Sequence, residues 1–156
     1  MRTVNLENVE AFYQIGDFTG LGLIDSIIIG PKVSSEEEVA LLKAEGVQHV
    51  IDMKRDGETP FSDKEEFEKQ GITYRHFPVA NPIDIDFDEL KSLEKDIKET
   101  DGKLYIYCMS GNRVSGILAR FFVEVCGHPK ERVLDAITKL QMIRPDLLEA
   151  TKIKLS

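Results

Sequence analysis

The sequence predicts a single α/β domain with a mostly parallel central sheet of four to five strands and helices on both faces. Two observations support this prediction. Short apolar runs rich in β-branched residues recur along the chain, and segments with helical spacing of apolar residues lie between them. Such alternation is typical of parallel strands joined by right-handed helical crossovers. The predicted strands are residues 24–29, 47–53, 72–79 and 104–108.

The helices between these strands begin and end at residues with known capping preferences. Ser35 lies three residues before Glu38, as in a capping box, and Gly46 ends the helix that follows. The same spacing begins a second helix at Ser62. A proline after Arg144 favours the first turn of a last helix. Apolar spacing predicts three further helices, over residues 87–97, 112–126 and 133–140.

The chain has the size and composition of one domain. Its 156 residues, of which 42% are hydrophobic, are enough for one packed core, so we assign residues 1–156 to a single domain. Residues 1–20 contain aromatic and apolar side chains without a clear period. We interpret them as an N-terminal extension that packs on the domain.

Charge and hydropathy exclude several classes of partner. The net charge is −8, and neither lysine nor arginine forms a run, which argues against nucleic acid or an anionic membrane as the main partner. No apolar run approaches the roughly 18 to 20 residues that a membrane span needs. The first ten residues lack the apolar segment of a signal peptide. We therefore expect a cytoplasmic protein.

The cysteines and histidines predict neither a disulfide nor a metal site. A helix over residues 112–126 is roughly 20 Å long at about 1.5 Å per residue, so Cys108 and Cys126 lie too far apart to bridge. We interpret Cys126 as a core residue. The spacing of the three histidines matches no zinc pattern. The expected metal and cofactor content is none.

Residues 103–118 carry the clearest signal about function: a buried strand, a loop from Cys108 to Arg113, and a helix. Backbone N–H groups at a helix N-terminus stabilise a thiolate and also bind a tetrahedral anion. Arg113 adds a planar charge that grips two oxygens at once, and Gly111 permits a tight loop. The sequence thus predicts Cys108 as a nucleophile and Arg113 as a clamp. The predicted phosphate-binding residues are Met109, Ser110, Gly111, Asn112 and Arg113.

This loop and its neighbouring segments resemble the cysteine-dependent phosphatase superfamily of tyrosine and dual-specificity type. The resemblance is closest to the bacterial beta-lactamase-hydrolase-like phosphatase branch, whose order of segments is similar to residues 23–31, 38–58 and 74–79. It covers roughly residues 20–140. The resemblance implies a phosphatase-type α/β fold and hydrolysis of phosphomonoesters through a phosphocysteine at Cys108. The implied substrate is a phosphorylated protein or a small phosphorylated molecule.

The loop departs from the usual pattern of these enzymes in three places. Tyrosine phosphatases usually have five residues between cysteine and arginine, whereas four stand here. Tyr107 replaces the usual histidine before the cysteine, and Val114 stands where a serine or threonine often follows the arginine, with Ser115 one residue later. The short spacing is also that of rhodanese sulfurtransferases, which carry a persulfide on the cysteine. A sulfurtransferase and a non-catalytic phosphate-binding module therefore remain alternatives to the phosphatase.

A general acid would protonate the leaving group, and the resemblance places it after the third strand. Asp86 forms a capping box with Glu89, and Asp88 falls in the first helical turn, so helix capping explains both. Asp84 is left as the candidate acid. Asp56, in an acidic glycine turn, is the rival, and the alternative for that segment is a solvated turn. The sequence does not choose between these two aspartates, and it is silent on oligomeric state.

Overall fold

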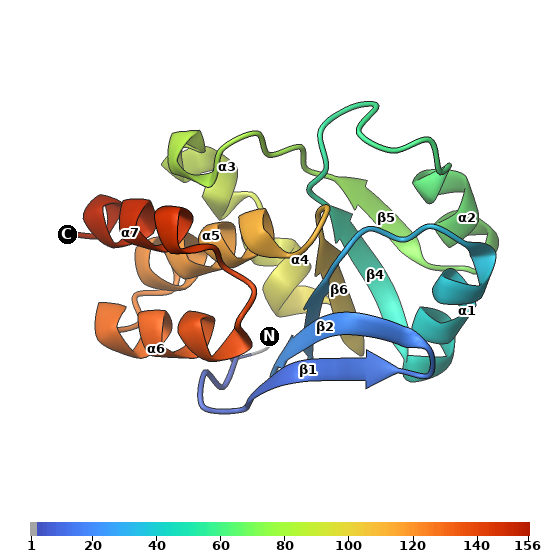
Figure 1. Ribbon diagram of the computed structural model, residues 1–156, viewed down its shortest axis with the longest axis horizontal. Helices are drawn as coiled ribbons and strands as arrows, with labels where there is room; N and C mark the ends of the chain where they lie inside the picture. Colours follow the sequence, from blue (N-terminus) through green and yellow to red (C-terminus); the bar gives the residue numbers. More distant parts are fainter. Residues whose placement is uncertain (1–2) are drawn as a thin grey trace.

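The computed structural model describes residues 3–156 and contains one six-stranded sheet (Figure 1). The strand order is β1-β2-β3-β6-β4-β5. Strands β3, β6, β4 and β5 are parallel, while β1 and β2 run antiparallel to their neighbours. The predicted α/β class is confirmed, but the sheet is mixed and has six strands, not four to five. The strands are β1 (Val9–Ile15), β2 (Phe18–Ile24), β3 (Ile27–Gly30), β4 (Val47–Asp52), β5 (Thr73–His76) and β6 (Lys103–Tyr107).

The two additional strands, β1 and β2, come from the N-terminal part of the chain, so residues of the predicted extension join the sheet beside β3. Side chains of β1 do alternate between half-buried and exposed positions. The alternation is hard to read because Phe12 takes a positive φ of 56° at a register shift and is 75% exposed. The predicted strand 24–29 also contains a turn, at Asp25 with φ 56°, which separates β2 from β3.

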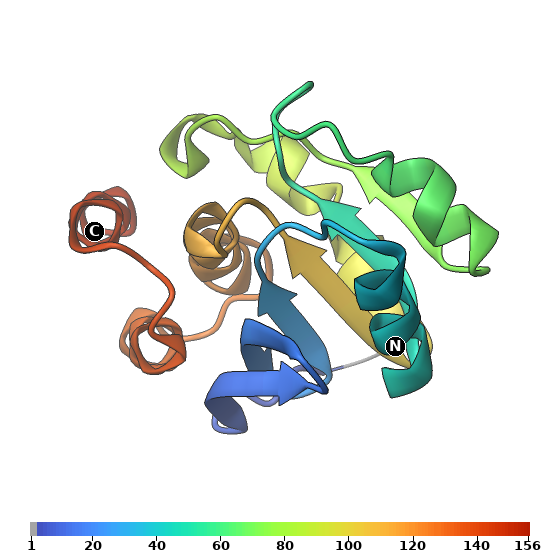
Figure 2. The same ribbon diagram turned by 45° about the vertical axis from the view of Figure 1, so that its right-hand side comes forward.

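Helices cover both faces of the sheet (Figures 1 and 2). Helices α1 and α2 pack on one face, and α3 to α6 pack on the other with α7 outside them. A 3₁₀ turn, η1, precedes α3, and a π-helical turn, η2, continues α5. The bounds are α1 (Glu36–Glu45), α2 (Asp63–Lys69), η1 (Pro82–Asp84), α3 (Phe87–Lys91), α4 (Glu94–Glu99), α5 (Asn112–Arg120), η2 (Phe121–Val125), α6 (Lys130–Leu140) and α7 (Pro145–Lys154).

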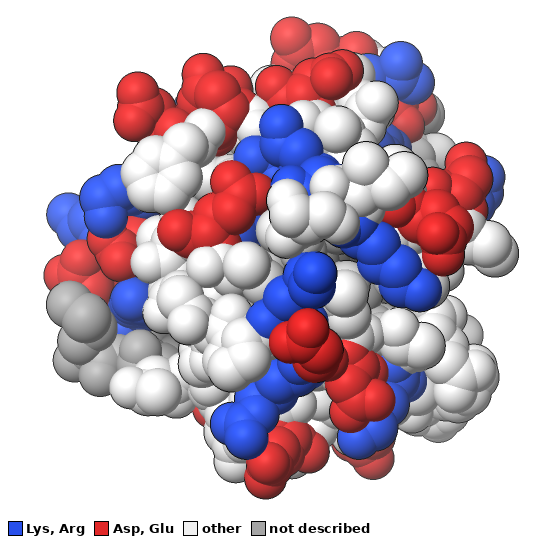
Figure 3. All heavy atoms as spheres, turned by 90° about the vertical axis from the view of Figure 1, so that its left-hand side faces the viewer, with Lys and Arg blue, Asp and Glu red and all other residues white. Residues whose placement is uncertain are grey.

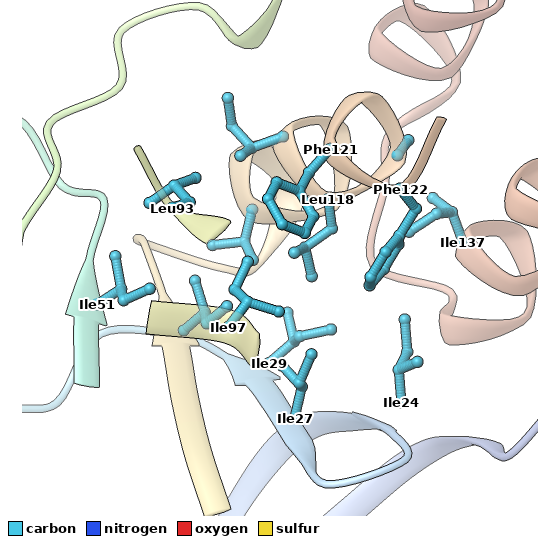
Figure 4. Packing of buried hydrophobic residues seen from close by; sticks show 14 of the residues in the cluster. Ile24, Ile27, Ile29, Ile51, Leu93, Ile97, Leu118, Phe121, Phe122 and Ile137 are labelled. Carbon is cyan, nitrogen blue, oxygen red and sulfur yellow. The ribbon is translucent and has the colours of Figure 1, made fainter. Parts of the chain in front are cut away.

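Each face of the sheet has its own hydrophobic core because neighbouring residues of a strand point to opposite sides. On β6, Leu104 and Ile106 belong to the core under α3 to α6, whereas Tyr105 and Tyr107 belong to the core under α1 and α2. Figure 4 shows the first of these cores, in which isoleucines of the sheet meet Phe121 and its neighbours from the helical layer. Strand β6 is therefore buried on both faces and holds the loop that follows it in a fixed place.

Most predicted helix ends are confirmed. The Ser35 side chain accepts a hydrogen bond from the Glu38 amide, and Gly46 ends α1 with φ 103°. Asp86 and Glu89 form the complete capping box that begins α3. Pro145 begins α7 as predicted. Ser62 does precede α2 but makes no side-chain capping bond.

Two predicted helices differ from the structure. Residues 87–97 form two short helices instead of one, because the chain tightens between them, where the Leu93 amide bonds Leu90 O three residues back. The predicted helix 112–126 widens into a π-helical turn after Arg120. Such turns insert one extra residue into the helix and change the direction of the side chains that follow.

No helix within residues 3–156 is long and apolar enough to cross a membrane. On the face that carries α6 and α7, basic and acidic side chains lie next to one another (Figure 3). That face therefore lacks the continuous basic surface that nucleic acid binding uses.

Candidate active site

The loop that begins at Cys108 joins the buried strand β6 to helix α5 at the carboxyl edge of the parallel strands. Cys108 is 1% exposed, and the Gly111 amide donates a hydrogen bond to its Sγ over 3.2 Å. Gly111 has φ 96°, and a Cβ there would lie 2.4 Å from the Met142 side chain. Only glycine fits both the backbone conformation and the space. The sequence thus places its nucleophile candidate inside a tight, well-packed loop.

The neighbouring segments hold the backbone of this loop in place. The Cys108 amide donates to Gly30 O, and the Lys32 amide donates to Met109 O over 3.2 Å. The Asn112 side chain accepts a hydrogen bond from the Arg144 amide over 2.7 Å. The loop is therefore tied to the end of β3 on one side and to the start of α7 on the other.

Several amides of the loop remain available as donors. No side chain caps α5, and none of the recorded hydrogen bonds of residues 3–156 uses the amides of Asn112, Arg113 or Val114. The first amides of a helix have no acceptor within the helix, and they carry its positive partial charge. The loop thus has the donor set that a tetrahedral anion needs. The Ser115 hydroxyl donates to Gly111 O over 2.8 Å, so it supports the loop backbone.

Arg113 is oriented by three hydrogen bonds that leave one edge of its guanidinium open. Its Nη1 and Nη2 donate to the two carboxylate oxygens of Glu58, each over 2.8 Å, and Nη1 also donates to Val79 O. An arginine side chain has five N–H bonds in a planar fork. The Nε–H and one Nη2–H remain, and they lie on the same edge. That edge is suited to bidentate binding of an oxyanion.

The pKa shifts of Glu58 and Arg113 agree with this hydrogen-bond geometry. The hydrogen bonds from Arg113 are the main reason that the pKa of Glu58 falls from 4.5 to about 2, against the opposing effect of burial. In return, Glu58 raises the pKa of Arg113, and the charge and proximity of Cys108 raise it further. Glu58 is therefore ionised, and the Arg113 guanidinium is near enough to Cys108 to interact with it electrostatically.

Sequence reasoning did not assign a role to Glu58, although it noted the acidic glycine turn that contains it. The turn is closed by the Arg55 amide, which donates to Glu58 Oε1 over 2.7 Å, and by the Glu58 amide, which donates to Arg55 O. An acidic residue after a strand that neighbours the nucleophile strand was the available signal. The separation of 55 positions between Glu58 and Arg113 hides the pairing in the sequence.

A buried polar network anchors this turn behind the site. Lys54 Nζ lies 3.4 Å from Asp52 Oδ2 and 3.0 Å from Asp63 Oδ2. Tyr74 donates to Asp52 over 2.5 Å, and Tyr107, which precedes Cys108, donates to Asp63 over 2.6 Å. Burial together with these carboxylates raises the pKa of both tyrosines, so they stay protonated. The network connects the ends of β4, β5 and β6, which surround the loop.

The structure does not bring either candidate acid into contact with the nucleophile. Asp84 is exposed at the end of η1, a segment held against α5 by hydrogen bonds from Arg120 to Pro82 O and Ile85 O. Asp56 is 92% exposed and lies 3.5 Å from His76 Nδ1. No recorded hydrogen bond or ion pair of residues 3–156 joins either carboxylate to the cysteine or the arginine of the loop. Both stay predictions.

The remaining cysteine and two of the three histidines, His49 and His128, lie outside this site. Cys126 is half-buried against the core, and burial raises the pKa of its thiol. His49 hydrogen-bonds Asp96 over 2.7 Å, and His128 packs edge-on against Phe122. Among residues 3–156 no three histidine, cysteine or acidic side chains are grouped as ligands for a metal ion.

Solved structures with a similar fold include candidate phosphatases and the phosphatase Tk-PTP. A candidate phosphatase from Neisseria meningitidis matches 86% of this chain and 96% of its own, at 20% identity and a TM-score of 0.69. A candidate phosphatase (DUF442) from Shewanella putrefaciens matches 97% of each chain, at 18% identity and a TM-score of 0.59. A variant of TpbA from P. aeruginosa, in complex with pTyr, matches 97% of this chain and 85% of its own, at 17% identity and a TM-score of 0.66.

No protein-family model and no curated protein sequence matches this chain. At these identities the similarity concerns the fold. The fold is that of the PTP-like, cysteine-dependent phosphatases.

Proposed function

We propose that this protein is a phosphomonoester hydrolase that works through a phosphocysteine at Cys108. The observation that carries the proposal is Arg113, which is held by Glu58 with its Nε–H and one Nη2–H unused and which interacts electrostatically with Cys108. The uncapped amides at the start of α5 add further N–H donors after the same cysteine. A transferring phosphoryl group has three equatorial oxygens that need such donors.

The proposed reaction has two steps. In the first, Cys108 Sγ forms a bond to phosphorus while the bond from phosphorus to the ester oxygen breaks. Asp84 gives a proton to the leaving oxygen, a contribution typically worth about 10² to 10⁴ in rate. In the second, water attacks the phosphocysteine and gives its proton to Asp84, and Cys108 leaves as a thiolate. Asp84 is proposed for this role because it is exposed and none of the recorded hydrogen bonds uses its carboxylate.

Aryl phosphates are the first substrates to test. TpbA, which shares the fold, binds pTyr. Phosphorylated proteins and small phosphorylated molecules both remain within the proposed substrate class, since the loop recognises the phosphoryl group and not its carrier.

A sulfurtransferase is the second candidate, and the four residues between Cys108 and Arg113 favour it. In that reaction Cys108 attacks the outer sulfur of a donor such as thiosulfate, and sulfite leaves. The persulfide then passes its outer sulfur to an acceptor thiolate. A persulfide makes less use of a bidentate guanidinium, because it offers one charged atom instead of several oxygens.

A non-catalytic phosphate-binding module is the third candidate. The absence of a recorded bond from Asp84 or Asp56 to the loop favours it, because such a protein needs the donors of the loop but no acid. Binding of phosphate without turnover would distinguish it from both enzymes.

The decisive experiment compares wild-type protein with Cys108→Ser and Arg113→Lys on para-nitrophenyl phosphate and on thiosulfate. We expect hydrolysis of the aryl phosphate, loss of activity in Cys108→Ser, and a decrease in kcat of roughly 10² to 10³ in Arg113→Lys, because lysine keeps the charge but not the bidentate geometry. Mass spectrometry of the trapped intermediate identifies what Cys108 carries. Turnover of thiosulfate with one sulfur added at Cys108, and no hydrolysis of phosphate esters, would replace the phosphatase by the sulfurtransferase.

A further inference from the structure

A pocket of about 470 Å³ opens beside the nucleophile loop, and neither proposed step uses it. One wall is the segment after β3, with Lys32 and Ser34, and the opposite wall is the segment before α2, with Phe61. Met109 and Glu58 also line it. The volume lies within the range of small-molecule sites, which is about 300 to 1,000 Å³.

The position of the pocket connects it to the reacting group. Met109 directly follows Cys108, and Glu58 is the carboxylate that orients Arg113. The Lys32 amide donates a hydrogen bond to Met109 O, so the wall of the pocket that contains Lys32 is fixed against the loop. Figure 2 shows the segment after β3, the turn after β4 and the start of α5 meeting at this edge of the sheet. A phosphoryl group bound at Cys108 therefore has this pocket next to it, and the pocket is available to the organic part of a substrate.

The charge in the pocket is positive although the chain is acidic overall. Both oxygens of Glu58 are bonded to Arg113, so that pair is neutral as a unit. Lys32 is half-buried, and its Nζ donates to Ser34 Oγ over 3.0 Å. None of the ion pairs recorded for residues 3–156 includes Lys32. The pocket thus presents one ammonium group without a recorded ion pair, on a segment whose Ser34 amide donates to the Glu38 carboxylate.

The remaining walls suit an organic body. Phe61 and Met109 are apolar, and so are Val33 and Pro60 on the two facing segments. Thr59, on the wall with Phe61, has the only buried side-chain oxygen of the described residues without a hydrogen-bond partner. A buried hydroxyl without a partner is uncommon in folded proteins. On this wall, therefore, the Thr59 hydroxyl is available for a hydrogen bond and lies next to an apolar surface.

We propose that this pocket binds the organic part of the substrate and that Lys32, together with the Ser34 hydroxyl, binds a second anionic group on it. The preferred substrates are then phosphomonoesters that carry another negative charge, as a carboxylate or a second phosphate. This inference rests on the proposed function for its place in the reaction, but its binding part is measurable without turnover.

The test uses pairs of ligands that differ by one anionic group. N-acetyl-phosphotyrosine and its C-terminal amide differ by a carboxylate, and fructose 1,6-bisphosphate and fructose 6-phosphate differ by a phosphate. Their dissociation constants are measured by calorimetry on Cys108→Ser protein, which holds phosphoryl ligands without turnover. We expect the ligand with the extra anion to bind roughly three- to tenfold more tightly in at least one pair, the size of one charge-assisted hydrogen bond at a half-buried site.

Lys32→Met, made in the same Cys108→Ser protein, should reduce the ratio of the two dissociation constants in a pair to about one. Lys32→Glu should invert this ratio. Lys154→Met is the matched control, because it changes the net charge equally on α7, at the opposite end of the molecule from α1 (Figure 1). In this control, the ratio of dissociation constants should equal the ratio measured in Cys108→Ser protein with Lys32 intact. The carboxylate pair and the phosphate pair report separately which anion Lys32 accepts.

Equal affinities within both pairs, or a ratio that survives Lys32→Met, would overturn the inference. Failure of the proposed function gives a different result. If wild-type protein hydrolyses no ester while the Lys32-dependent ratio persists in Cys108→Ser, the pocket inference stands and the hydrolase proposal is lost. If esters are hydrolysed with no preference for a second anion, only the pocket inference is lost.

Discussion

Replacing Glu58 by glutamine tests how strongly its carboxylate holds Arg113. The carboxylate accepts two hydrogen bonds of 2.8 Å, whereas the amide of glutamine would turn an N–H group toward one of the guanidinium donors. One pKa unit corresponds to about 1.4 kcal/mol. The decrease of the Glu58 pKa from 4.5 to about 2 therefore corresponds to a stabilisation of at most about 3.5 kcal/mol by its native contacts.

The pH dependence of this stabilisation has a defined sign. Above pH 4.5 Glu58 is ionised in both the folded and the unfolded protein, so the full contribution is present. Between pH 4.5 and about 2 the unfolded state binds a proton that the folded state does not, and the contribution is lost as the pH falls. The free energy of unfolding of wild-type protein should therefore decrease through this window more steeply than that of Glu58→Gln.

The assay is urea unfolding at a series of pH values from 2 to 7, for wild type, Glu58→Gln and Glu99→Gln. The last variant makes the same charge change at an exposed position, and we expect it to follow wild type. Glu58→Gln should be about 2 to 3 kcal/mol less stable at pH 7, and the difference should approach zero near pH 2. A difference that stays constant across the series, or no difference at pH 7, would refute the assignment of this stability to the ion pair.

Two further predictions concern the chemistry of individual residues. Asp84→Asn should lower the rate of alkyl phosphate hydrolysis by a factor of roughly 10² to 10⁴ and barely affect para-nitrophenyl phosphate, because only a poor leaving group needs protonation. Asp56→Asn is the matched comparison. If Asp56→Asn shows this pattern instead, the general acid is Asp56. At pH 6, iodoacetamide should alkylate Cys108 faster than Cys126, because the Gly111 amide donates to the Cys108 sulfur and Arg113 interacts with it electrostatically, while burial raises the pKa of Cys126. Peptide mapping by mass spectrometry measures both rates, and equal rates would remove the argument for an activated nucleophile.

The parts of the fold that sequence reasoning predicted correctly are those that short segments specify. The parallel strand that ends at Tyr107 is a continuous apolar run, and such runs are typical of strands buried on both faces. Ser35 and Gly46 cap α1 through bonds to residues only a few positions away. The Cys108 loop follows the same rule, because a strand, a glycine and a helix start within ten residues specify its conformation.

The parts that sequence reasoning missed depend on contacts between distant residues. The hairpin of β1 and β2 joins the sheet through pairing with β3, while a bulge at Phe12 hides its alternation. Asp63 falls in the first turn of α2, where its sequence position suggests a helix-dipole role, but its carboxylate binds the buried Lys54 and Tyr107. Pairing of this kind leaves no periodic signal in one sequence.

The amino-acid sequence by itself determined the α/β class, the position of the nucleophile candidate and the helix N-terminus that can bind an anion. These features follow from hydrophobic period, glycine conformation and helix capping, which act over one or two turns of chain. Only the tertiary structure decided that Glu58 orients Arg113 and which edge of the guanidinium stays open. It alone also placed Lys32 in a pocket beside Met109. The physical reason is that the pleat and register of a parallel sheet, and not proximity in the chain, bring the ends of β3, β4 and β6 to one edge.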